Sequence, residues 1–472
     1  MTKAKPKPAA LPHPADRKVE TNPAILSLIG NTPLVRISKF DTGPCQLFAK
    51  LESQNPGGSI KDRIALAMIE AAEQAGTLTP GGTIVEATAG NTGLGLALVA
   101  AAKGYQLVLV IPDKMAVEKI NHLRALGAET RITRSDVGKG HADYYQDIAE
   151  RIARETGGFY VNQFANPANP KAHEEWTGPE ILRQMDHDLD AMVVGVGSGG
   201  TLTGLGRCFR KLSPKTRMVI ADPAGSVIRD IVETGTHGEA GSWVVEGIGE
   251  DFVPPNCDLS FASSAYTVAD AEGLAAGREL LRREGILGGS STGTMFAAAL
   301  RYCRTRAAPE RVAFLVADTG NKYLSKMYND AWMADQGFIG HDRHGDLRDL
   351  LARRYDRGQV VSVAASDTLL TAFKRMRIAD VSQLPVMEGD HVVGLLDESD
   401  LLLHVQEDPA HFRDPVTTAM TARLETVPMN APLSILTGIF DRNLVALVVD
   451  GEHFLGLLTR VDLLNHLRRK LG

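Results

Sequence analysis

The chain alternates between two kinds of apolar pattern from Asn22 to about Gly340. Short runs rich in Val and Ile, typical of buried strands, are separated by longer runs whose apolar residues recur with a helical period. The predicted strands include TIVEA, QLVLVIP, AMVVGV, RMVIA and RVAFLVA, and the predicted helices include LALVAAAKG and EKINHLRALGAE. This alternation predicts an α/β fold with a largely parallel sheet, covered by helices on both faces. Ligands of such sheets bind beyond the carboxyl ends of the strands.

The pattern changes after this region. Residues 341–358 are charged and poor in large apolar residues, so we expect an interdomain linker there. An internal repeat follows: HVVGLLDESDLLLHV (391–405) and HFLGLLTRVDLLNHL (453–467) are identical at 8 of 15 positions. Two copies of a strand-turn-helix unit predict a duplicated small domain. The expected domains are 23–340, 359–411 and 412–472.

Composition narrows the function classes. Residues 1–22 are rich in Lys, Pro and Ala without an apolar stretch, which predicts a disordered tail and no secretory signal. The 472 residues carry a formal net charge of −6, which argues against nucleic-acid binding, and no apolar run is long enough to span a membrane. The four cysteines are far apart, so we expect no disulfide framework, no metal site and a reducing, cytoplasmic location. The expected partners are small molecules.

A glycine-rich loop, GVGSGG (195–200), follows a predicted strand and precedes a predicted helix. A helix N-terminus of this kind favours an anion such as phosphate. The candidate phosphate-binding residues are Gly197, Ser198, Gly199, Gly200 and Thr201. The loop also has G-x-G-x-x-G spacing, and Asp222 ends the next strand at the distance typical of dinucleotide-binding folds. An NAD-dependent dehydrogenase therefore remains one of the functions that this loop allows.

Two more loops and one lysine carry candidate chemistry. EATAGNTGLGLA (86–97) joins a strand to a helix and offers hydroxyls, an amide and backbone N–H groups suited to a carboxylate. Its candidate residues are Thr88, Ala89, Gly90, Asn91 and Thr92. GILGGSSTGT (285–294) places Ser291 after two glycines, and NPGGSIKDR (55–63) places Lys61 at the start of a predicted helix. A lysine is slightly unfavourable at that end of the helix dipole, so its position needs a reason.

In this order, GGSIKDR, EATAGNTGLGLA, GVGSGGTLTG and EGILGGSSTG resemble the β-family, or fold type II, of pyridoxal-phosphate enzymes. DKMAVEKINHLRALGAE (113–129), VVEGIGEDFVP (244–254) and YNDAWMADQGF (328–338) are more similar to the cystathionine β-synthase branch than to plain cysteine synthases. The C-terminal repeat is similar to the paired CBS (Bateman) module of those enzymes. The resemblance runs from about Pro23 to the C-terminus. It implies a catalytic core of two doubly wound α/β subdomains, followed by a tandem CBS-domain module.

The resemblance implies roles for the cofactor-site residues. Lys61 would be the Schiff-base lysine and the general base, Asn91 would contact the ring hydroxyl of pyridoxal phosphate, and 197–201 would hold its phosphate. Ser291 would face the pyridine nitrogen. A neutral hydroxyl there makes the ring a weaker electron sink than a carboxylate would, which favours elimination and replacement at Cβ over transamination.

The implied reaction is a β-replacement on serine or O-acetylserine by homocysteine. It gives cystathionine in transsulfuration and cysteine metabolism, with side reactions that produce hydrogen sulfide. The carboxylate of the amino-acid substrate would bind the loop at 88–92, with Gln163 as a neighbour and Gly247 lining the cavity. Lys61 would take the α-proton before the β-substituent leaves.

This sequence departs from the family pattern at two positions. Ala89 stands where serine is common, and Glu250 stands where the eukaryotic synthases have tyrosine, so the identities of the donor and of the thiol stay open. The haem of some relatives is not expected, because the tail offers only His13 as a conventional ligand and has no cysteine.

Three alternatives remain open. They are a cysteine synthase that uses O-acetylserine and sulfide, the NAD-dependent dehydrogenase, and a nucleotide-sensing protein whose catalytic half has decayed. The dehydrogenase leaves Lys61 and Ser291 without a role, and the intact lysine, asparagine and phosphate loop argue against decay.

The resemblance also implies a nucleotide site in the C-terminal repeat. Asp400 and Asp462 take the same position in the two copies, where related modules bind a ribose. The second copy has Thr459 where the first has Asp397, whose charge would repel an adenylate phosphate. We therefore expect the Thr459/Asp462 site to be the better one for an adenosyl ligand, with a purely assembling module as the alternative. The family implies a homodimer or a larger homo-oligomer.

Overall fold

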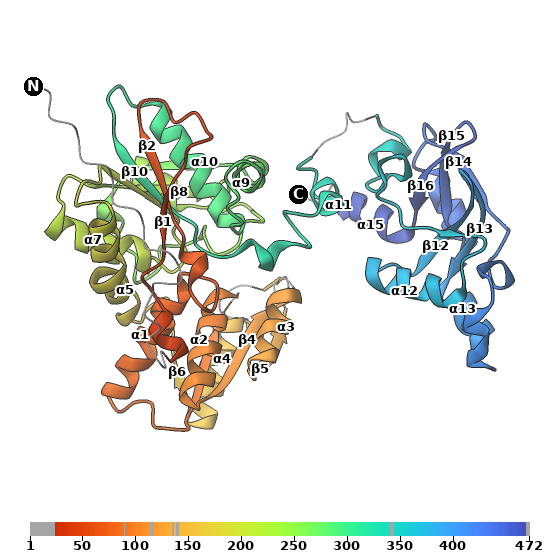
Figure 1. The fold of residues 1–472 in the computed structure, drawn as a ribbon. Coiled ribbons are helices and arrows are strands. Elements are labelled where there is room, and N and C mark those ends of the chain that lie inside the picture. The colour runs from red at the N-terminus through yellow and green to blue at the C-terminus, as the bar shows by residue number, and fades with distance from the viewer. Residues whose placement is uncertain are drawn as a thin grey trace, which may run out of the picture. The chain divides into compact units, whose positions relative to one another are not determined.

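The structure, a computed structural model, describes residues 24–88, 90–113, 115, 117–134, 136–137, 141–339 and 344–468. The chain divides into two compact units, Met1–Leu324 and Ser325–Gly472 (Figure 1). The tail predicted at 1–22, together with Ala89, lies outside the described residues. Within the described ranges, no helix combines the length and the apolar character needed to cross a membrane.

The larger subdomain of the first unit is built on a six-stranded sheet with the order β1-β2-β10-β7-β8-β9. Its strands are β1 (Leu34–Arg36), β2 (Gln46–Lys50), β7 (Ala191–Val194), β8 (Arg217–Pro223), β9 (Ala262–Val268) and β10 (Arg311–Leu315). β1 pairs antiparallel with β2, and every other neighbouring pair in this sheet is parallel. The helices of this subdomain are α6 (Gly178–Gln184), α7 (Gly200–Leu212), α8 (Ile228–Thr234), α9 (Asp270–Glu284) and α10 (Ser290–Arg304).

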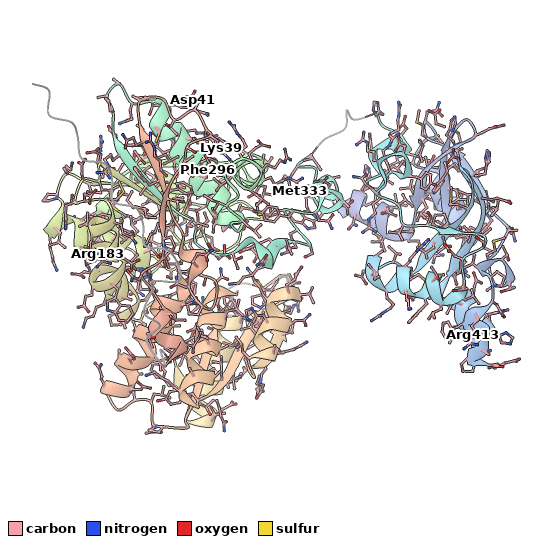
Figure 2. The ribbon with its side chains drawn as sticks, in the orientation of Figure 1. Lys39, Asp41, Arg183, Phe296, Met333 and Arg413 are labelled. Atoms are coloured by element: carbon pink, nitrogen blue, oxygen red, sulfur yellow. The ribbon has the colours of Figure 1, made fainter. Side chains whose placement is uncertain are left out.

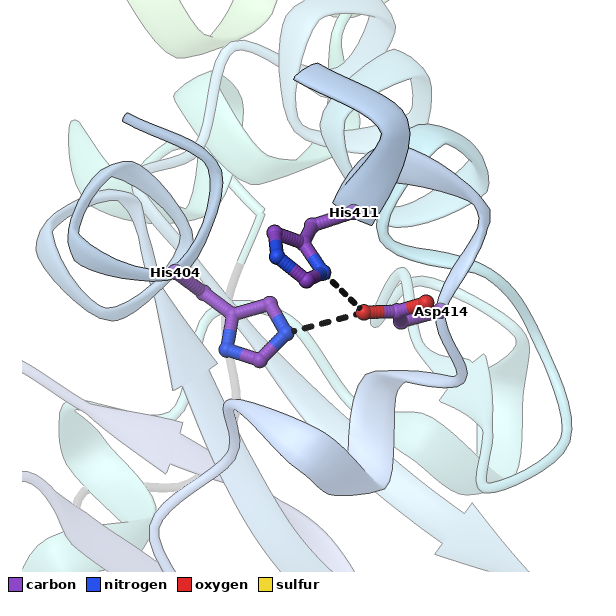
Figure 3. A group of neighbouring side chains, drawn as sticks. All are labelled: His404, His411 and Asp414. Carbon is purple, nitrogen blue, oxygen red and sulfur yellow. Dashed lines mark hydrogen bonds and ion pairs between the residues drawn. The ribbon is translucent and has the colours of Figure 1, made fainter. Parts of the chain in front are cut away.

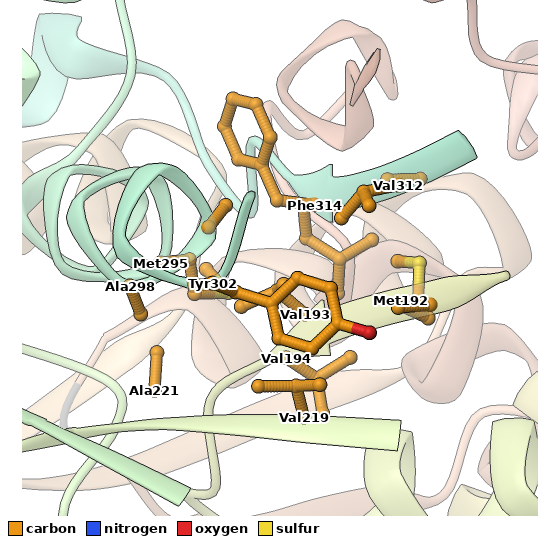
Figure 4. Packing of buried hydrophobic residues seen from close by; sticks show 14 of the residues in the cluster. Met192, Val193, Val194, Val219, Ala221, Met295, Ala298, Tyr302, Val312 and Phe314 are labelled. Atoms are coloured by element: carbon orange, nitrogen blue, oxygen red, sulfur yellow. The ribbon is translucent and has the colours of Figure 1, made fainter. Parts of the chain in front are cut away.

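Apolar side chains fill the space between this sheet and its helices. Figure 4 shows Val194 and Val219 of the sheet packed close to Met295 and Tyr302 of α10. Phe296, labelled in Figure 2, is fully buried on the same helix. Strands that are buried on both faces need apolar residues at every position, which explains the continuous apolar runs in the sequence.

The smaller subdomain has a parallel four-stranded sheet with the order β5-β4-β3-β6. Its strands are β3 (Thr83–Ala87), β4 (Gln106–Pro112), β5 (Glu129–Thr133) and β6 (Phe159–Tyr160), and its helices are α1 (Lys61–Gln74), α2 (Asn91–Lys103), α3 (Val117–Ala125), α4 (Tyr145–Thr156) and α5 (Ala168–Ala172). Ile84 and Leu109 belong to the core shared with α1 and α2, whereas Val85 and Val108 belong to the core shared with α4. Both faces of the sheet are therefore covered, and the predicted fold class of two doubly wound subdomains is confirmed.

The second unit contains α11 (Asp330–Asp335) and two small sheets of three strands each. The first copy consists of β11 (Val363–Ala364), α12 (Leu369–Ala379), β12 (Gln383–Glu388), β13 (His391–Asp397) and α13 (Glu398–Val405). The second consists of β14 (Glu425–Pro428), α14 (Ile435–Phe440), β15 (Ala446–Asp450), β16 (His453–Leu458) and α15 (Arg460–Arg468). Each sheet pairs its first two strands in parallel and ends in a hairpin with an irregularity at the matching place. The repeat seen in the sequence is a structural duplication.

The segment predicted as a linker contributes to the core of the second copy. Leu347, Leu350 and Leu351 are buried together with Leu436 and Ile439 of α14. The backbone N–H of Leu347 also donates to the Ala431 carbonyl, 3.2 Å away. The domain boundaries stay predictions, but residues 347–351 pack as part of the folded module.

Candidate active site

Four helices of the first unit begin at one cavity. Lys61, Asn91 and Gly200 are the first residues of α1, α2 and α7, and Ser291 is the second residue of α10. The predicted site residues that line the cavity are Lys61, Asn91, Gly197, Ser198, Gly199, Thr201, Gly247 and Ser291. Leu315, at the carboxyl end of β10, lines it as well. Motifs that are far apart in the sequence therefore meet where a ligand of an α/β sheet is expected.

The loop at 197–201 leaves no room for side chains at two of its glycines. Gly199 has a φ of 80°, and a Cβ there would lie 2.3 Å from Cβ of Cys257. A Cβ at Gly200 would lie 1.9 Å from Oδ1 of Asn169. Ser198 is fixed by the same asparagine, whose Nδ2 donates to the serine Oγ over 2.9 Å. The loop thus presents backbone N–H groups at the start of α7, as an anion-binding turn requires.

The loop at 88–92 is ordered by its own hydroxyls. The N–H of Gly90 donates to Oγ1 of Thr88 (3.2 Å), and Oγ1 of Thr92 donates to Oε1 of Gln163 (2.6 Å). Thr88, Thr92 and Gln163 are all buried. The structure therefore brings Gln163 to the loop, as expected from the sequence, although its contact with a substrate stays a prediction.

Lys61 enters the cavity from the first turn of α1. Burial lowers the pKa of its amine, while the negative charges of Glu250 and Asp318 oppose that change. Glu250, one of the two departures from the family pattern, therefore lies close enough to act on this amine. A lowered pKa increases the fraction of neutral amine, which is the form that acts as a nucleophile or a base.

A buried polar network, which the sequence did not predict, orients Asn91. Nδ2 of Asn91 donates to Oδ2 of Asp318 (2.7 Å), and the same oxygen accepts from the Tyr323 hydroxyl (2.7 Å). Nζ of Lys322 donates to Oδ1 of Asn91 (2.9 Å) and to the carbonyl of Gly57 (3.1 Å). Lys322 thereby ties Asn91 to the loop that precedes Lys61.

A second feature that the sequence did not predict is an ion pair between Lys119 and Glu246. Lys119 belongs to α3 of the smaller subdomain and is 2% exposed, whereas Glu246 lies beside Gly247 in a loop of the larger subdomain. The lysine also donates to the Tyr323 hydroxyl (3.1 Å). A Cβ at Gly90 would lie 3.0 Å from Cδ of Lys119, so the pair sits directly against the loop at 88–92.

Asp222, on which the dehydrogenase alternative rested, has a structural contact. It is 1% exposed, and its Oδ2 accepts the backbone N–H of Arg229 (2.8 Å) in the first turn of α8. Burial raises the pKa of Asp222 to about 6. A carboxylate engaged at a helix start in this way is not presented to a ribose, and the dehydrogenase is not favoured.

Comparison with known proteins identifies the family. Residues 25–318 match the family described as pyridoxal-phosphate dependent enzyme, and residues 348–407 and 416–469 match the CBS domain. The chain is 33% identical over 462 residues to cystathionine beta-synthase of Apis mellifera, covering 95% of this chain and 91% of that protein. The chain belongs to the cystathionine β-synthase family of pyridoxal-phosphate-dependent enzymes. The Saccharomyces cerevisiae member is 30% identical over 504 residues, covering 96% of this chain and 99% of the yeast protein.

Solved structures are similar to this chain over about two thirds of its length. A hydrogen sulfide-producing enzyme from Fusobacterium nucleatum is 37% identical with a TM-score of 0.60, covering 64% of this chain and 100% of that protein. An O-ureido-L-serine synthase is 36% identical with a TM-score of 0.61, covering 66% of this chain and 99% of that protein. The cofactor of the family is pyridoxal phosphate.

The residues that line the cavity of this cystathionine β-synthase-family chain fit pyridoxal phosphate. The glycine loop, which excludes a Cβ at Gly199 and Gly200, suits the phosphate. Ser291 offers a neutral hydroxyl, and Lys61 offers an amine in the same cavity. The sequence motifs pointed to these residues, whereas Lys119 and Lys322, both buried in the structure, were not predicted from the sequence.

Proposed function

We propose that the enzyme joins serine or O-acetylserine to homocysteine by β-replacement, giving cystathionine. The observation that carries this proposal is the Lys119–Glu246 ion pair beside the loop at 88–92. Homocysteine carries a carboxylate and an ammonium group, which match a lysine and a glutamate held side by side. Sulfide, the nucleophile of a cysteine synthase, offers neither group, so the pair favours homocysteine as the thiol.

The cofactor would be held by residues already described. Residues 197–201 would hold its phosphate, Asn91 its ring hydroxyl and Ser291 its ring nitrogen, and Lys61 would bind it covalently. When bound, pyridoxal phosphate supplies the electron sink that acidifies the α-proton of an amino acid. Lys322 and Asp318 act through Asn91, because both hold its amide in place.

The chain's own residues would then orient the donor and move its proton. Backbone N–H groups at the start of α2 suit the carboxylate of the donor amino acid. Nζ of Lys61, with its lowered pKa, takes the α-proton as a general base. The proton on Nζ is next available to the oxygen that leaves Cβ. The negative charge of Glu250 stabilises the protonated amine at that stage.

Side reactions that release hydrogen sulfide follow from the same site. Cysteine differs from serine only in its β-substituent, so it fits the same carboxylate loop and would release sulfide as the leaving group. The similarity to a hydrogen sulfide-producing enzyme supports this extension.

Substitution of Lys61 tests the proposed chemistry. We expect Lys61→Ala to abolish turnover while the fold survives, because the nucleophile and the base are lost together. Borohydride reduction of the wild-type enzyme should add the mass of the cofactor to the peptide that contains Lys61. Labelling of another lysine, or normal turnover in the variant, would contradict the assignment.

Substitution of Lys119 tests the choice of thiol separately. We expect Lys119→Ala to lower kcat/KM for homocysteine by more than about tenfold, a loss of about 1.4 kcal/mol in transition-state stabilisation. The rate with sulfide should stay within about threefold, because sulfide has neither a carboxylate nor an ammonium group for this pair to bind. Lys103→Ala is the matched control, since Lys103 pairs with Glu73 (2.8 Å) outside the set of residues lining the cavity. Equal losses with both nucleophiles would refute homocysteine specificity and leave the β-replacement itself standing.

We also propose that the second CBS copy binds an adenosyl ligand. Oδ2 of Asp462 accepts from the N–H and from Oγ1 of Thr459, both over 2.7 Å, so the two predicted residues are adjacent. In the first copy, Asp397 caps α13 and exchanges hydrogen bonds with Asp400. Burial and the charge of Asp397 raise the pKa of Asp400. Two neighbouring carboxylates disfavour a phosphate there.

Calorimetry with AMP, ATP and S-adenosylmethionine on wild type and Asp462→Ala tests this ligand. We expect binding in the wild type and its loss in the variant. Indifference to the substitution, or no binding at all, would leave the module with an assembling role. An effect on activity further requires that the ligand bind two conformations with different affinity.

A homodimer or larger homo-oligomer and a cytoplasmic location complete the proposal. All four cysteines lie among the described residues, and each is free. Unpaired thiols are typical of a reducing compartment. Light scattering of the purified chain measures the oligomeric state directly.

A further inference from the structure

We propose that the first CBS copy carries a divalent transition-metal site formed by His404, His411 and Asp414. Among the described residues, this is the one group of three His, Cys, Asp or Glu side chains whose ligand atoms all lie within 4.8 Å of one another. Figure 3 shows both imidazole rings pointing toward the same carboxylate oxygen. No metal site was expected from the sequence, because its four cysteines are far apart.

The three ligands come from two elements that are close in the chain. His404 lies in the last turn of α13, and His411 lies in the short helical segment Pro409–Arg413, which is followed by Asp414. The backbone of Asp414 is itself anchored, because its carbonyl accepts the N–H of Leu369 (2.9 Å) at the start of α12. A metal ion bound here would therefore connect the end of α13 to the segment that follows it.

Two hydrogen-bond distances can be compared with the separations around a coordinated ion, and all three ligand atoms lie within 4.8 Å of one another. Nε2 of His404 lies 3.2 Å from Oδ2 of Asp414, and Nδ1 of His411 lies 2.7 Å from the same oxygen. A tetrahedral zinc ion with ligands at about 2.0–2.2 Å separates its ligand atoms by about 3.3–3.5 Å. The first separation needs almost no change, and the second must lengthen by about 0.7 Å, which a small rotation of side chains provides.

The chemistry of the donor set selects the class of ion. Two imidazole nitrogens and one carboxylate oxygen suit Zn²⁺, Co²⁺, Ni²⁺ or Fe²⁺ and not Ca²⁺ or Mg²⁺, which prefer oxygen ligands. The side chains of His404, His411 and Asp414 are 26%, 44% and 36% exposed, so solvent reaches the site and water can complete the coordination. The carboxyl end of α13 adds a partial negative charge that favours a cation.

Binding would replace the present hydrogen bonds. Each neutral imidazole now shares a hydrogen with Asp414, and that hydrogen must move to the other ring nitrogen before the first can donate its lone pair to the metal. A protonated imidazole must instead release its proton to solvent before it can bind the metal.

The test is a zinc titration of the full-length, cofactor-loaded enzyme, without a histidine tag and in competition with a chromophoric chelator. We expect one site per chain whose affinity falls by more than about tenfold in His404→Gln and in Asp414→Asn. His391→Gln is the matched control, because His391 is an exposed histidine of the same domain and should leave the affinity unchanged. Zinc should also raise the melting temperature of the wild type and of the control, but not that of Asp414→Asn, which preserves the shape of the side chain.

Cobalt identifies the ligands independently. We expect Co²⁺ to give the absorption of a site with nitrogen and oxygen donors, and that absorption should disappear in the double variant H404Q/H411Q. Thiolate-to-cobalt bands would show that a cysteine binds the metal instead and would overturn the proposal. Zinc binding that is equal in the wild type, His404→Gln and Asp414→Asn, or no binding in the wild type, would overturn it as well.

Discussion

Arg63 holds together a buried cluster of charges. When it is replaced, the catalytic unit should unfold at a much lower concentration of denaturant. Its guanidinium makes four hydrogen bonds of 2.8–3.0 Å, two with Glu52 and two with Glu180. Lys50 forms a further ion pair with Glu180. Arg63, Lys50 and Glu52 are at most 1% exposed, so water cannot replace a missing partner. Two positive and two negative groups leave the cluster neutral.

Arg63→Met removes one positive charge and leaves a net negative charge in this buried place. Loss of one partner from a buried ion pair costs about 3–5 kcal/mol, because the remaining charge stays desolvated. Burial alone would raise the pKa of Glu180, yet the hydrogen bonds from Arg63 and Lys50 lower it to about 2. Without Arg63, this carboxylate loses much of its stabilisation, and we expect the free energy of unfolding to fall by about 4 kcal/mol.

Urea unfolding followed by tryptophan fluorescence measures this loss. Trp176 and Trp243 lie in the first unit, whereas Trp332 lies in α11 of the second. Every variant is therefore made in a Trp332→Phe background, in which the signal reports on the catalytic part of the chain. Pyridoxal phosphate must be equally saturating in every sample, because ligand binding shifts apparent stability. Arg131→Met is the control: Arg131 pairs with Glu129 at the surface, where about half of each side chain is exposed, and the expected cost is below about 1 kcal/mol.

A double variant separates the charge imbalance from lost packing. Adding Glu52→Gln to Arg63→Met restores neutrality, so the double variant should be more stable than the sum of the single losses by about 1–3 kcal/mol. If Arg63→Met costs no more than the surface control, the buried cluster does not stabilise the fold. Additive losses would show that packing and not charge accounts for the effect.

Three other predictions concern the active site and its surroundings. Burial raises the pKa of Glu86 to about 8, so the native state keeps a proton that an unfolded chain releases at about pH 4.3. The free energy of unfolding should therefore fall as the pH rises from the lower of these values to the higher. Glu86→Gln should remove up to about 1.4 kcal/mol per pH unit of that slope, as measured by urea titrations. Gly199→Ala, which forces a Cβ against Cys257, should lower cofactor retention after dialysis, and full retention would contradict the tight loop. O-acetylserine should be a measurable donor for the wild type, and Ala89→Ser should shift the kcat/KM ratio toward serine; a strong wild-type preference for serine that the substitution leaves unchanged would refute this.

The glycine-rich loops could be recognised from the sequence because their requirements are local. A turn that passes close to a ligand and then starts a helix needs small residues at fixed spacing, and Gly197 to Thr201 show this directly. Lys61 could be placed in the same way, since it directly follows such a turn. The strands were predictable because full burial leaves continuous apolar runs.

The buried lysines could not be recognised, because their surroundings are assembled from distant segments. Asn91 and Asp318 are 227 positions apart, and Lys119 and Glu246 are 127 positions apart. No local pattern distinguishes such a lysine from one at the surface. Leu347, Leu350 and Leu351 of the predicted linker are a different case. Their spacing of three positions and then one matches one face of a helical turn, but the charged residues around them favoured the interpretation as a linker.

Those leucines also affect how the chain can fold as it is synthesised. Leu347, Leu350 and Leu351 leave the ribosome before the first CBS copy, whereas Leu436 and Ile439, against which they pack, leave only with the second. During the interval their apolar surface has no native partner, and exposed surface of this kind promotes misassembly. A chain cut between the two copies would keep that exposure permanently. The packing of residues 347–351 is therefore completed only after Leu436 and Ile439 have been synthesised, when the whole first CBS copy has already left the ribosome.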